Sequence, residues 1–213
     1  MNKTTMSNKE RIREMTLLAM FIAIIAMLGL IPNPAIPGSS IGFVKIGPNI
    51  EATFIHIPVI IGAALMGRKN SILIGLAFGV ISNIAAFVYA SPFFVYPWVA
   101  ILPRLVFGFI IYDFTMVFRK LIKNAYIAYA VSFLLLTLIH TLLVLTMLWT
   151  SFAIVMNQPL FESFGPYLTF LITYNVPTAG LIEAGFAAVV GGTIFVRIAR
   201  YYHSQGEEQE IEG

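Results

Sequence analysis

Residues 71–90 read SILIGLAFGVISNIAAFVYA, an unbroken apolar stretch without a charged side chain. A helix needs about 20 mostly apolar residues to cross the hydrocarbon core of a bilayer. A strand of a membrane barrel would instead alternate apolar and polar residues, and this stretch does not. The stretch therefore predicts a membrane-spanning helix, and it sets the class of protein to which the chain belongs.

The composition of the whole chain supports a membrane protein. Of its 213 residues, 59% are hydrophobic and 11% are charged, whereas soluble domains are about 45–50% apolar and about 25% charged. One small domain cannot hide that much apolar surface from water, so the surface is expected to face lipid. The length fits a single membrane domain over residues 1–213. The chain has no cysteine, which excludes disulfides and thiolate sites.

Six segments are predicted to span the membrane as an all-α helical bundle, and no strand is expected among them. The segments are residues 15–31, 53–66, 71–90, 98–118, 125–153 and 167–199. The second segment is short for a span and contains Pro58. It is retained because the charges at the helix ends sort correctly only when the number of spans is even.

The basic residues predict the orientation of the bundle, because Lys and Arg favour cytoplasmic connections. Most of the 13 Lys and Arg residues lie in residues 3–13, 68–69, 119–123 and 197–200. The connections on the other side contain only Lys45. Both ends are therefore expected in the cytoplasm, with residues 1–14 as an N-terminal segment and residues 203–213 as a solvated, disordered tail.

The connection after the first predicted helix, residues 32–52, is the longest and is rich in proline and glycine. Long connections in compact proteins are usually lids or binding loops, and this one is expected to be an external lid. The alternative is a flexible external loop. Lys45 and Glu51 flank its Gly-Pro pair, and their roles are left open.

Polar side chains at membrane depth are costly, which makes them functional candidates. Arg104 follows Pro103 in the fourth predicted helix, and it is expected either to bind an acidic ligand or to pair with Glu183. The further candidates for ligand binding are Asn83, Tyr96, Trp98, His140, Tyr174 and Asn175. Helix packing, hydrogen bonds between helices and an interfacial aromatic belt are the alternative roles for these residues. Together they predict a small amphiphilic ligand with an acidic group.

Enzyme motifs are absent from the sequence. There is no phosphate-binding Walker loop, no His-Glu-x-x-His pair and no Gly-x-Ser-x-Gly elbow. Asp113 is the only aspartate, so paired aspartates that hold Mg²⁺ are excluded. A binding subunit without a cofactor or metal is expected. A membrane enzyme acting on lipid and a stand-alone secondary transporter are the alternatives, although no repeat of two halves is visible.

Several short stretches carry a family resemblance over nearly the whole chain. They are Ala19-Met-Phe-Ile-Ala23, Ile46-Gly-Pro-Asn49, residues 56–63, Ile101-Leu-Pro-Arg-Leu-Val-Phe-Gly108, residues 140–145, Asn175-Val-Pro and Leu181-Ile-Glu-Ala184. With these residues the chain resembles the membrane-embedded substrate-binding (S) components of energy-coupling factor (ECF) vitamin transporters. Among them it is similar to the pantothenate-type branch.

The resemblance implies a multi-pass subunit of the cell membrane that captures a vitamin from outside. It implies a partner module with one transmembrane coupling protein and two ATPases, and no nucleic acid. Ala19 and Ala23 resemble the Ala-x-x-x-Ala docking patch of the family, since small residues let another helix approach closely. Pantothenate is the favoured ligand, with riboflavin, folate or a pyrimidine precursor as alternatives.

Overall fold

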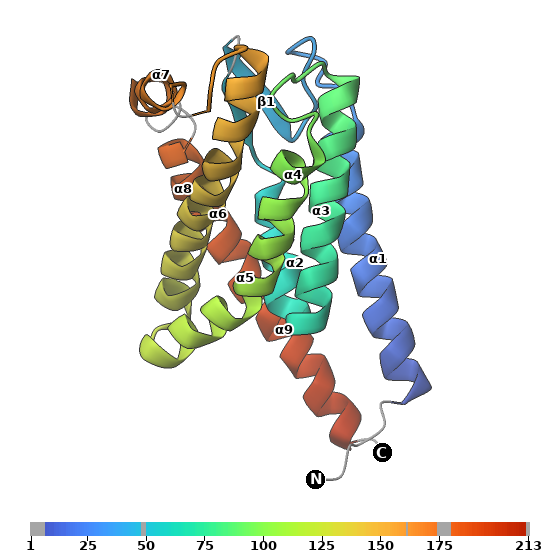
Figure 1. The fold of residues 1–213 in the computed structure, drawn as a ribbon. Helices are drawn as coiled ribbons and strands as arrows, with labels where there is room; N and C mark the ends of the chain where they lie inside the picture. The colour runs from blue at the N-terminus through green and yellow to red at the C-terminus, as the bar shows by residue number, and fades with distance from the viewer. Residues whose placement is uncertain (1–6, 48–49, 161, 174–179, 212–213) are drawn as a thin grey trace.

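The computed structural model describes residues 7–47, 50–160, 162–173 and 180–211. Long helices lie side by side in a bundle, with a small hairpin and a short transverse helix at one end (Figure 1). The elements are α1 Asn8–Leu30, β1 Phe43–Gly47, β2 Ile50–Thr53, α2 His56–Met66, α3 Arg68–Val88, α4 Pro97–Ala100, α5 Leu102–Leu121, α6 Ala125–Val155, α7 Phe164–Phe170, α8 Leu181–Phe186, the π-helical turn η2 Ala187–Gly191, and α9 Gly192–Ile211.

The predicted helical membrane architecture is confirmed in its main part. Within the described residues, five helical segments are long and apolar enough to cross a membrane. They are Asn8–Leu30, Arg68–Val88, Pro97–Leu121, Ala125–Val155 and Leu181–Tyr201. The second predicted span corresponds to α2, a buried helix of 11 residues that is about 16 Å long at 1.5 Å per residue. It lies inside the bundle and begins directly below the hairpin (Figure 1).

The sixth predicted helix, residues 167–199, is not continuous in the structure. Its first part belongs to the separate helix α7, and a second helical segment starts at α8. The predicted stretch is longer than the roughly 20 residues that one span requires, so its beginning can form a separate helix. At the other end, α9 continues to Ile211 through the segment predicted as a disordered tail, where glutamate and glutamine favour helix.

An antiparallel hairpin occupies the predicted lid, residues 32–52, where no strand was expected. Its register pairs Phe43 with Thr53 and Gly47 with Ile50. The Gly42 N–H donates to the Leu28 carbonyl oxygen at 2.8 Å. A Cβ on Gly42 would lie 2.3 Å from the Ile55 side chain, so only glycine fits here. The root of the hairpin is therefore fixed against the end of α1.

Helices α3 and α5 approach each other closely enough for their backbones to touch. A Cβ on Gly75 would lie 2.7 Å from Gly108 Cα, and a Cβ on Gly79 would lie 2.9 Å from Ile101 Cα. The Ser71 hydroxyl donates to the Gly108 carbonyl oxygen at 2.5 Å. Small residues spaced four apart permit such packing in lipid, where no hydrophobic force drives helices together.

The orientation predicted from the charges can be tested with single cysteines, since the chain has none of its own. Lys69 and Lys120 lie at one end of the bundle, and Pro92 lies at the hairpin end; all three are exposed. We expect a membrane-impermeant thiol reagent applied to intact cells to label Pro92→Cys and to leave Lys69→Cys and Lys120→Cys unlabelled. Labelling of Lys69→Cys in intact cells would invert the orientation.

The contact between α3 and α5 predicts the effect of one added methyl group. Gly75→Ala places a Cβ against the backbone of α5, and overpacking of this kind costs about 1–3 kcal/mol. We therefore expect a lower melting temperature for the purified variant in detergent. Gly185→Ala is the matched control, because its Cβ meets no atom within 4 Å. Equal melting temperatures for the two variants would contradict the proposed packing.

Candidate functional site

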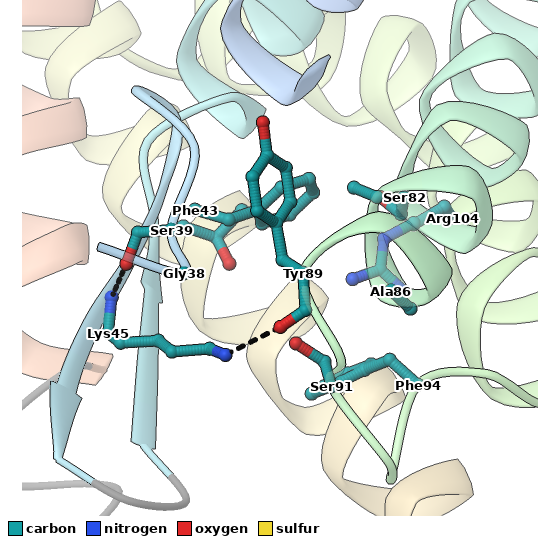
Figure 2. A pocket seen from close by; sticks show the side chains of 12 residues that line it. Gly38, Ser39, Phe43, Lys45, Ser82, Ala86, Tyr89, Ser91, Phe94 and Arg104 are labelled. Atoms are coloured by element: carbon teal, nitrogen blue, oxygen red, sulfur yellow. Dashed lines mark hydrogen bonds between the residues drawn. The ribbon is translucent and has the colours of Figure 1, made fainter. Parts of the chain in front are cut away.

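A cleft lies at the hairpin end of the bundle, between the hairpin, the end of α3 and the beginning of α5. About 380 Å³ of space, which includes open solvent, lies between its walls. The residues that line it are Gly38, Ser39, Phe43, Lys45, Thr53, Ser82, Ala85, Ala86, Tyr89, Ser91, Phe94 and Arg104. Figure 2 shows the hairpin strands on one side of this cleft and Arg104 on the other. The cleft is thus built from segments that are far apart in the sequence.

Lys45 closes the hairpin side of the cleft (Figure 2). Its Nζ donates to the Tyr89 carbonyl oxygen at 2.7 Å, and its backbone N–H donates to Ser39 Oγ at 3.1 Å. Tyr89 ends α3, where the helix dipole favours a cation. The Tyr89 hydroxyl donates to the Leu30 carbonyl oxygen at 2.7 Å. Lys45 and Tyr89 thus connect the hairpin to the ends of α3 and α1.

Arg104 forms the opposite wall and is buried, with 2% of its surface exposed. Its Nη1 donates to the carbonyl oxygens of Ala100 and Val99 at 2.8 and 3.2 Å. The guanidinium carbon lies 5.1 Å from the centre of the Phe78 ring and 5.7 Å from that of Phe94, within the range of cation–π attraction. The guanidinium is therefore held in place between α4 and two aromatic rings.

Glu183 was the alternative partner considered for Arg104. Its Oε1 accepts a hydrogen bond from the Thr53 N–H at 2.5 Å, so this carboxylate helps to fix the root of the hairpin. Of the described residues that line the cleft, Lys45 and Arg104 carry charge and none is acidic. Two cations on opposite walls make the cleft a favourable place for an anion.

Asn83 lies near the cleft but not in its lining as described. Its Nδ2 donates to the carbonyl oxygens of Val95 and Phe94 at 3.0 and 3.3 Å. The loop between α3 and α4 is therefore held in place by Asn83, and this loop carries Phe94 into the cleft. The structure gives Asn83 a supporting position.

The rings of Tyr96 and Trp98 pack against each other beside α6, with centres 4.9 Å apart and planes tilted by 35°. The Trp98 Nε1–H donates to Thr150 Oγ1 at 3.1 Å, and 43% of the tryptophan is exposed. Neither residue is among the described residues that line the cleft. The two other predicted contacts, Tyr174 and Asn175, lie outside the described residues.

His140 is buried deeper in the bundle. Its ring lies 5.9 Å from that of His56, 5.4 Å from that of Phe78 and 4.9 Å from that of Phe107, measured between centres. The four ring nitrogens of the two histidines have no hydrogen-bond partner within the described part of the chain. Phe78 contacts both His140 and Arg104, and His140 is not among the described residues of the cleft.

Ala19 and Ala23, predicted to form the docking patch, are both exposed on α1. They lie four residues apart and hence on one face of the helix. Met15 and Met27 continue this exposed face toward the two ends of the helix. Phe21 and Ile25 are buried on the opposite face, so the alanines point away from the bundle.

Six polar residues of the cleft were not among the predicted contacts: Ser39, Lys45, Thr53, Ser82, Tyr89 and Ser91. Lys45 had a detectable signal, since it is the only basic residue in the predicted external connections. Ser82 had none, because a serine within an apolar helix usually bonds to its own backbone.

Comparisons with known proteins agree with this architecture. The family model for the substrate-specific component of ECF transporters matches residues 13–194. The crystal structure of the S-component for biotin from an ECF-type ABC transporter has a similar fold, with a TM-score of 0.54 and 18% sequence identity. The alignment covers 89% of this chain and 94% of that one. The search of curated proteins gave no significant match.

The biotin S-component is too distant in sequence to show more than the shared fold. The family model, by contrast, extends from the first turns of α1 into α9. It covers the cleft, both of its cationic residues and the exposed alanines of α1. On this evidence the chain belongs to the family of substrate-specific components of ECF transporters.

Proposed function

We propose that this protein captures a small vitamin with one carboxylate, and that the vitamin is pantothenate. The observation that carries the proposal is the pair of cations, Lys45 and Arg104, on opposite walls of a cleft whose described lining has no acidic residue. The subunit works as a binding component of a transporter and not as an enzyme.

The carboxylate is the part of the ligand that needs this cleft most. Burying an unpaired carboxylate is strongly unfavourable, so it requires a cation or several donors. Arg104 supplies a planar guanidinium that suits a carboxylate, and its position is already fixed by Ala100 and Phe78. Lys45 can leave the Tyr89 carbonyl oxygen and turn toward the same anion.

The remaining lining suits the rest of such a ligand. Phe43, Phe94 and Ala86 offer apolar surface for a branched hydrocarbon part. Asn83 positions the loop that carries Phe94. His140 remains a proposed contact for an amide or hydroxyl, and it is reached only when the Phe78 ring turns away.

The residues outside the cleft retain proposed roles at its rim. Tyr96 and Trp98 pack against each other beside α6, and we propose that they close over the apolar part of the bound ligand. Tyr174 and Asn175 are proposed as contacts on sequence grounds. No part of the case for an acidic ligand depends on these four residues.

Biotin is the second candidate, because the protein with the similar fold is an S-component for biotin and biotin also has one carboxylate. Riboflavin has no carboxylate and folate has two, so both match the cleft less well. Mass spectrometry of compounds that co-purify with the protein, followed by calorimetry with pantothenate, biotin and riboflavin, identifies the ligand. Tight binding of riboflavin alone would contradict the proposal.

Arg104→Ala should weaken pantothenate binding by roughly 2–5 kcal/mol, the usual loss when one partner of a buried charge pair is removed. Lys45→Met should weaken it by about 1 kcal/mol or less, because contacts at a solvent-facing edge are worth less. Isothermal titration calorimetry on the purified variants measures both changes.

Lys69→Met is the matched control, since this exposed lysine lies at the opposite end of the bundle. Its affinity should equal that of the wild type. Arg104→Lys keeps the charge without the planar fork, and melting curves establish that each variant is folded. A folded Arg104→Ala variant with wild-type affinity would remove both the assigned role and most of the case for an acidic ligand.

The exposed face of α1 is proposed to dock on the transmembrane coupling protein of a module that also contains two ATPases. Bulky residues at Ala19 and Ala23 would prevent close helix approach. We expect the double variant Ala19→Trp/Ala23→Trp to bind ligand normally and to lose uptake in cells. Leu142→Trp, at a position 67% exposed on α6, is the control and should retain uptake. Normal uptake by the double variant would place the docking face elsewhere.

A further inference from the structure

Ser82 is a buried residue of α3 whose hydroxyl has no visible role within the protein. It lines the cleft, as Arg104 does, and only 4% of its surface is exposed (Figure 2). Its Oγ has no hydrogen-bond partner among the residues that the structure describes. Buried hydroxyls are nearly always hydrogen-bonded, because leaving one unsatisfied is unfavourable. A partner from outside the chain is therefore expected at this atom.

Other serine and threonine hydroxyls in the helices form a hydrogen bond to their own helix backbone that Ser82 does not form. A serine or threonine inside a helix commonly donates to a carbonyl oxygen in the preceding turn. Five hydroxyls on three other helices, α1, α6 and α9, do so: Thr16 to Ile12, Thr137 to Phe133, Thr146 to Leu142, Ser151 to Leu148 and Thr193 to Val189. Ser82 lacks this bond although its helix offers the same carbonyl groups, so its hydroxyl is available to the cleft.

Thr115 on α5 provides an internal comparison. It is as deeply buried as Ser82, and its hydroxyl also has no hydrogen-bond partner among the described residues. It lies three turns beyond Arg104 along α5, and the described lining of the cleft does not include it. An effect on binding that is specific to Ser82 would therefore come from its position in the cleft and not from its unsatisfied hydroxyl alone.

We propose that Ser82 is a specificity-determining residue that donates a hydrogen bond to the ligand carboxylate held by Arg104. A carboxylate has about four acceptor positions, of which one guanidinium can occupy two. A neighbouring hydroxyl supplies a further donor on the α3 side. This inference rests on the proposed function, because it requires an acidic ligand. It adds that Ser82 discriminates a carboxylate from an alcohol at the same position.

A cycle that combines a protein variant with a ligand variant tests the contact. Panthenol carries an alcohol where pantothenate carries the carboxylate. We expect Ser82→Ala to weaken pantothenate binding by about 10- to 100-fold, as for a hydrogen bond to a charged group. Panthenol binding should change less than threefold. Thr115→Val should leave both affinities unchanged, and calorimetry on the three proteins with the two ligands completes the cycle.

The ligand-free proteins give a second measurement. Removing an unsatisfied buried hydroxyl should leave the melting temperature of Ser82→Ala equal to or above that of the wild type. A clear decrease would show that the hydroxyl has a structural role and would overturn the proposal. Should Ser82→Ala fail to fold, Ser82→Cys keeps a similar volume with a weak donor and must show the same selective loss.

The remaining outcomes separate this inference from the proposed function. In one outcome the wild-type protein binds pantothenate, and Ser82→Ala either binds both ligands as tightly as the wild type or loses the same affinity for both. This outcome overturns the inference and leaves the proposed function intact. Wild-type protein that binds biotin instead is tested in the same way with biotin and biotinamide. Wild-type protein that binds neither acid overturns the proposed function, and the inference fails with it.

Discussion

The contact between the backbones of α3 and α5 determines the position of the candidate functional site. Gly75 and Gly108 let the two helices meet, and a Cβ on Gly75 would lie 2.7 Å from the carbonyl oxygen of Arg104 itself. Arg104 is therefore positioned by the same contact that joins the helices. Further along α3, past Gly79, the small residues Ser82 and Ala86 line the cleft. The close packing ends where the cleft begins.

The hairpin is fixed differently at its root and in its first strand. The root is held by backbone hydrogen bonds, by the tight fit of Gly42 against Ile55 and by the bond from Thr53 to Glu183. The first strand is joined to α3 by Lys45, whose ammonium group donates to one carbonyl oxygen. A carboxylate is a stronger acceptor for an ammonium group than a carbonyl is. An anion in the cleft therefore competes with the Lys45–Tyr89 bond without disturbing the root.

The sequence was sufficient to predict the features that depend on a residue's own hydropathy or charge. Hydropathy located the long helices, because the bilayer requires about 20 apolar residues regardless of tertiary context. Arg104 was identified because a charge at membrane depth is costly wherever it lies. The split of residues 167–199 and the helical continuation of α9 were missed, because an apolar stretch longer than one span can be divided in several ways.

The features that escaped prediction depend on neighbours distant in the sequence. The hairpin forms within a loop, and nothing in its short strands places Lys45 opposite the end of α3. Asn83 was predicted to bind ligand, and the structure shows its side chain bound to the backbone of the following loop. Ser82 became recognisable when its hydroxyl could be compared with those that bond within their own helices.

Electrostatics explains why a buried arginine suits a binding subunit of this kind. A guanidinium in a low-dielectric interior must be compensated, and Ala100, Val99, Phe78 and Phe94 contribute oriented dipoles and ring faces to this compensation. These groups carry no formal charge, so they stabilise the cation without adding negative charge to the cleft lining.

In the proposed function a bound carboxylate adds a negative charge beside Arg104, and a neutral compound of the same shape does not. The proposed selectivity for an acid rests on a cation that is held in place by carbonyl groups and aromatic rings. Lys45 lies on the opposite wall, on the hairpin, and the position of that wall depends on the movable contact to Tyr89. We therefore propose that Arg104 selects the ligand, and that Lys45 leaves Tyr89 and turns toward a bound anion.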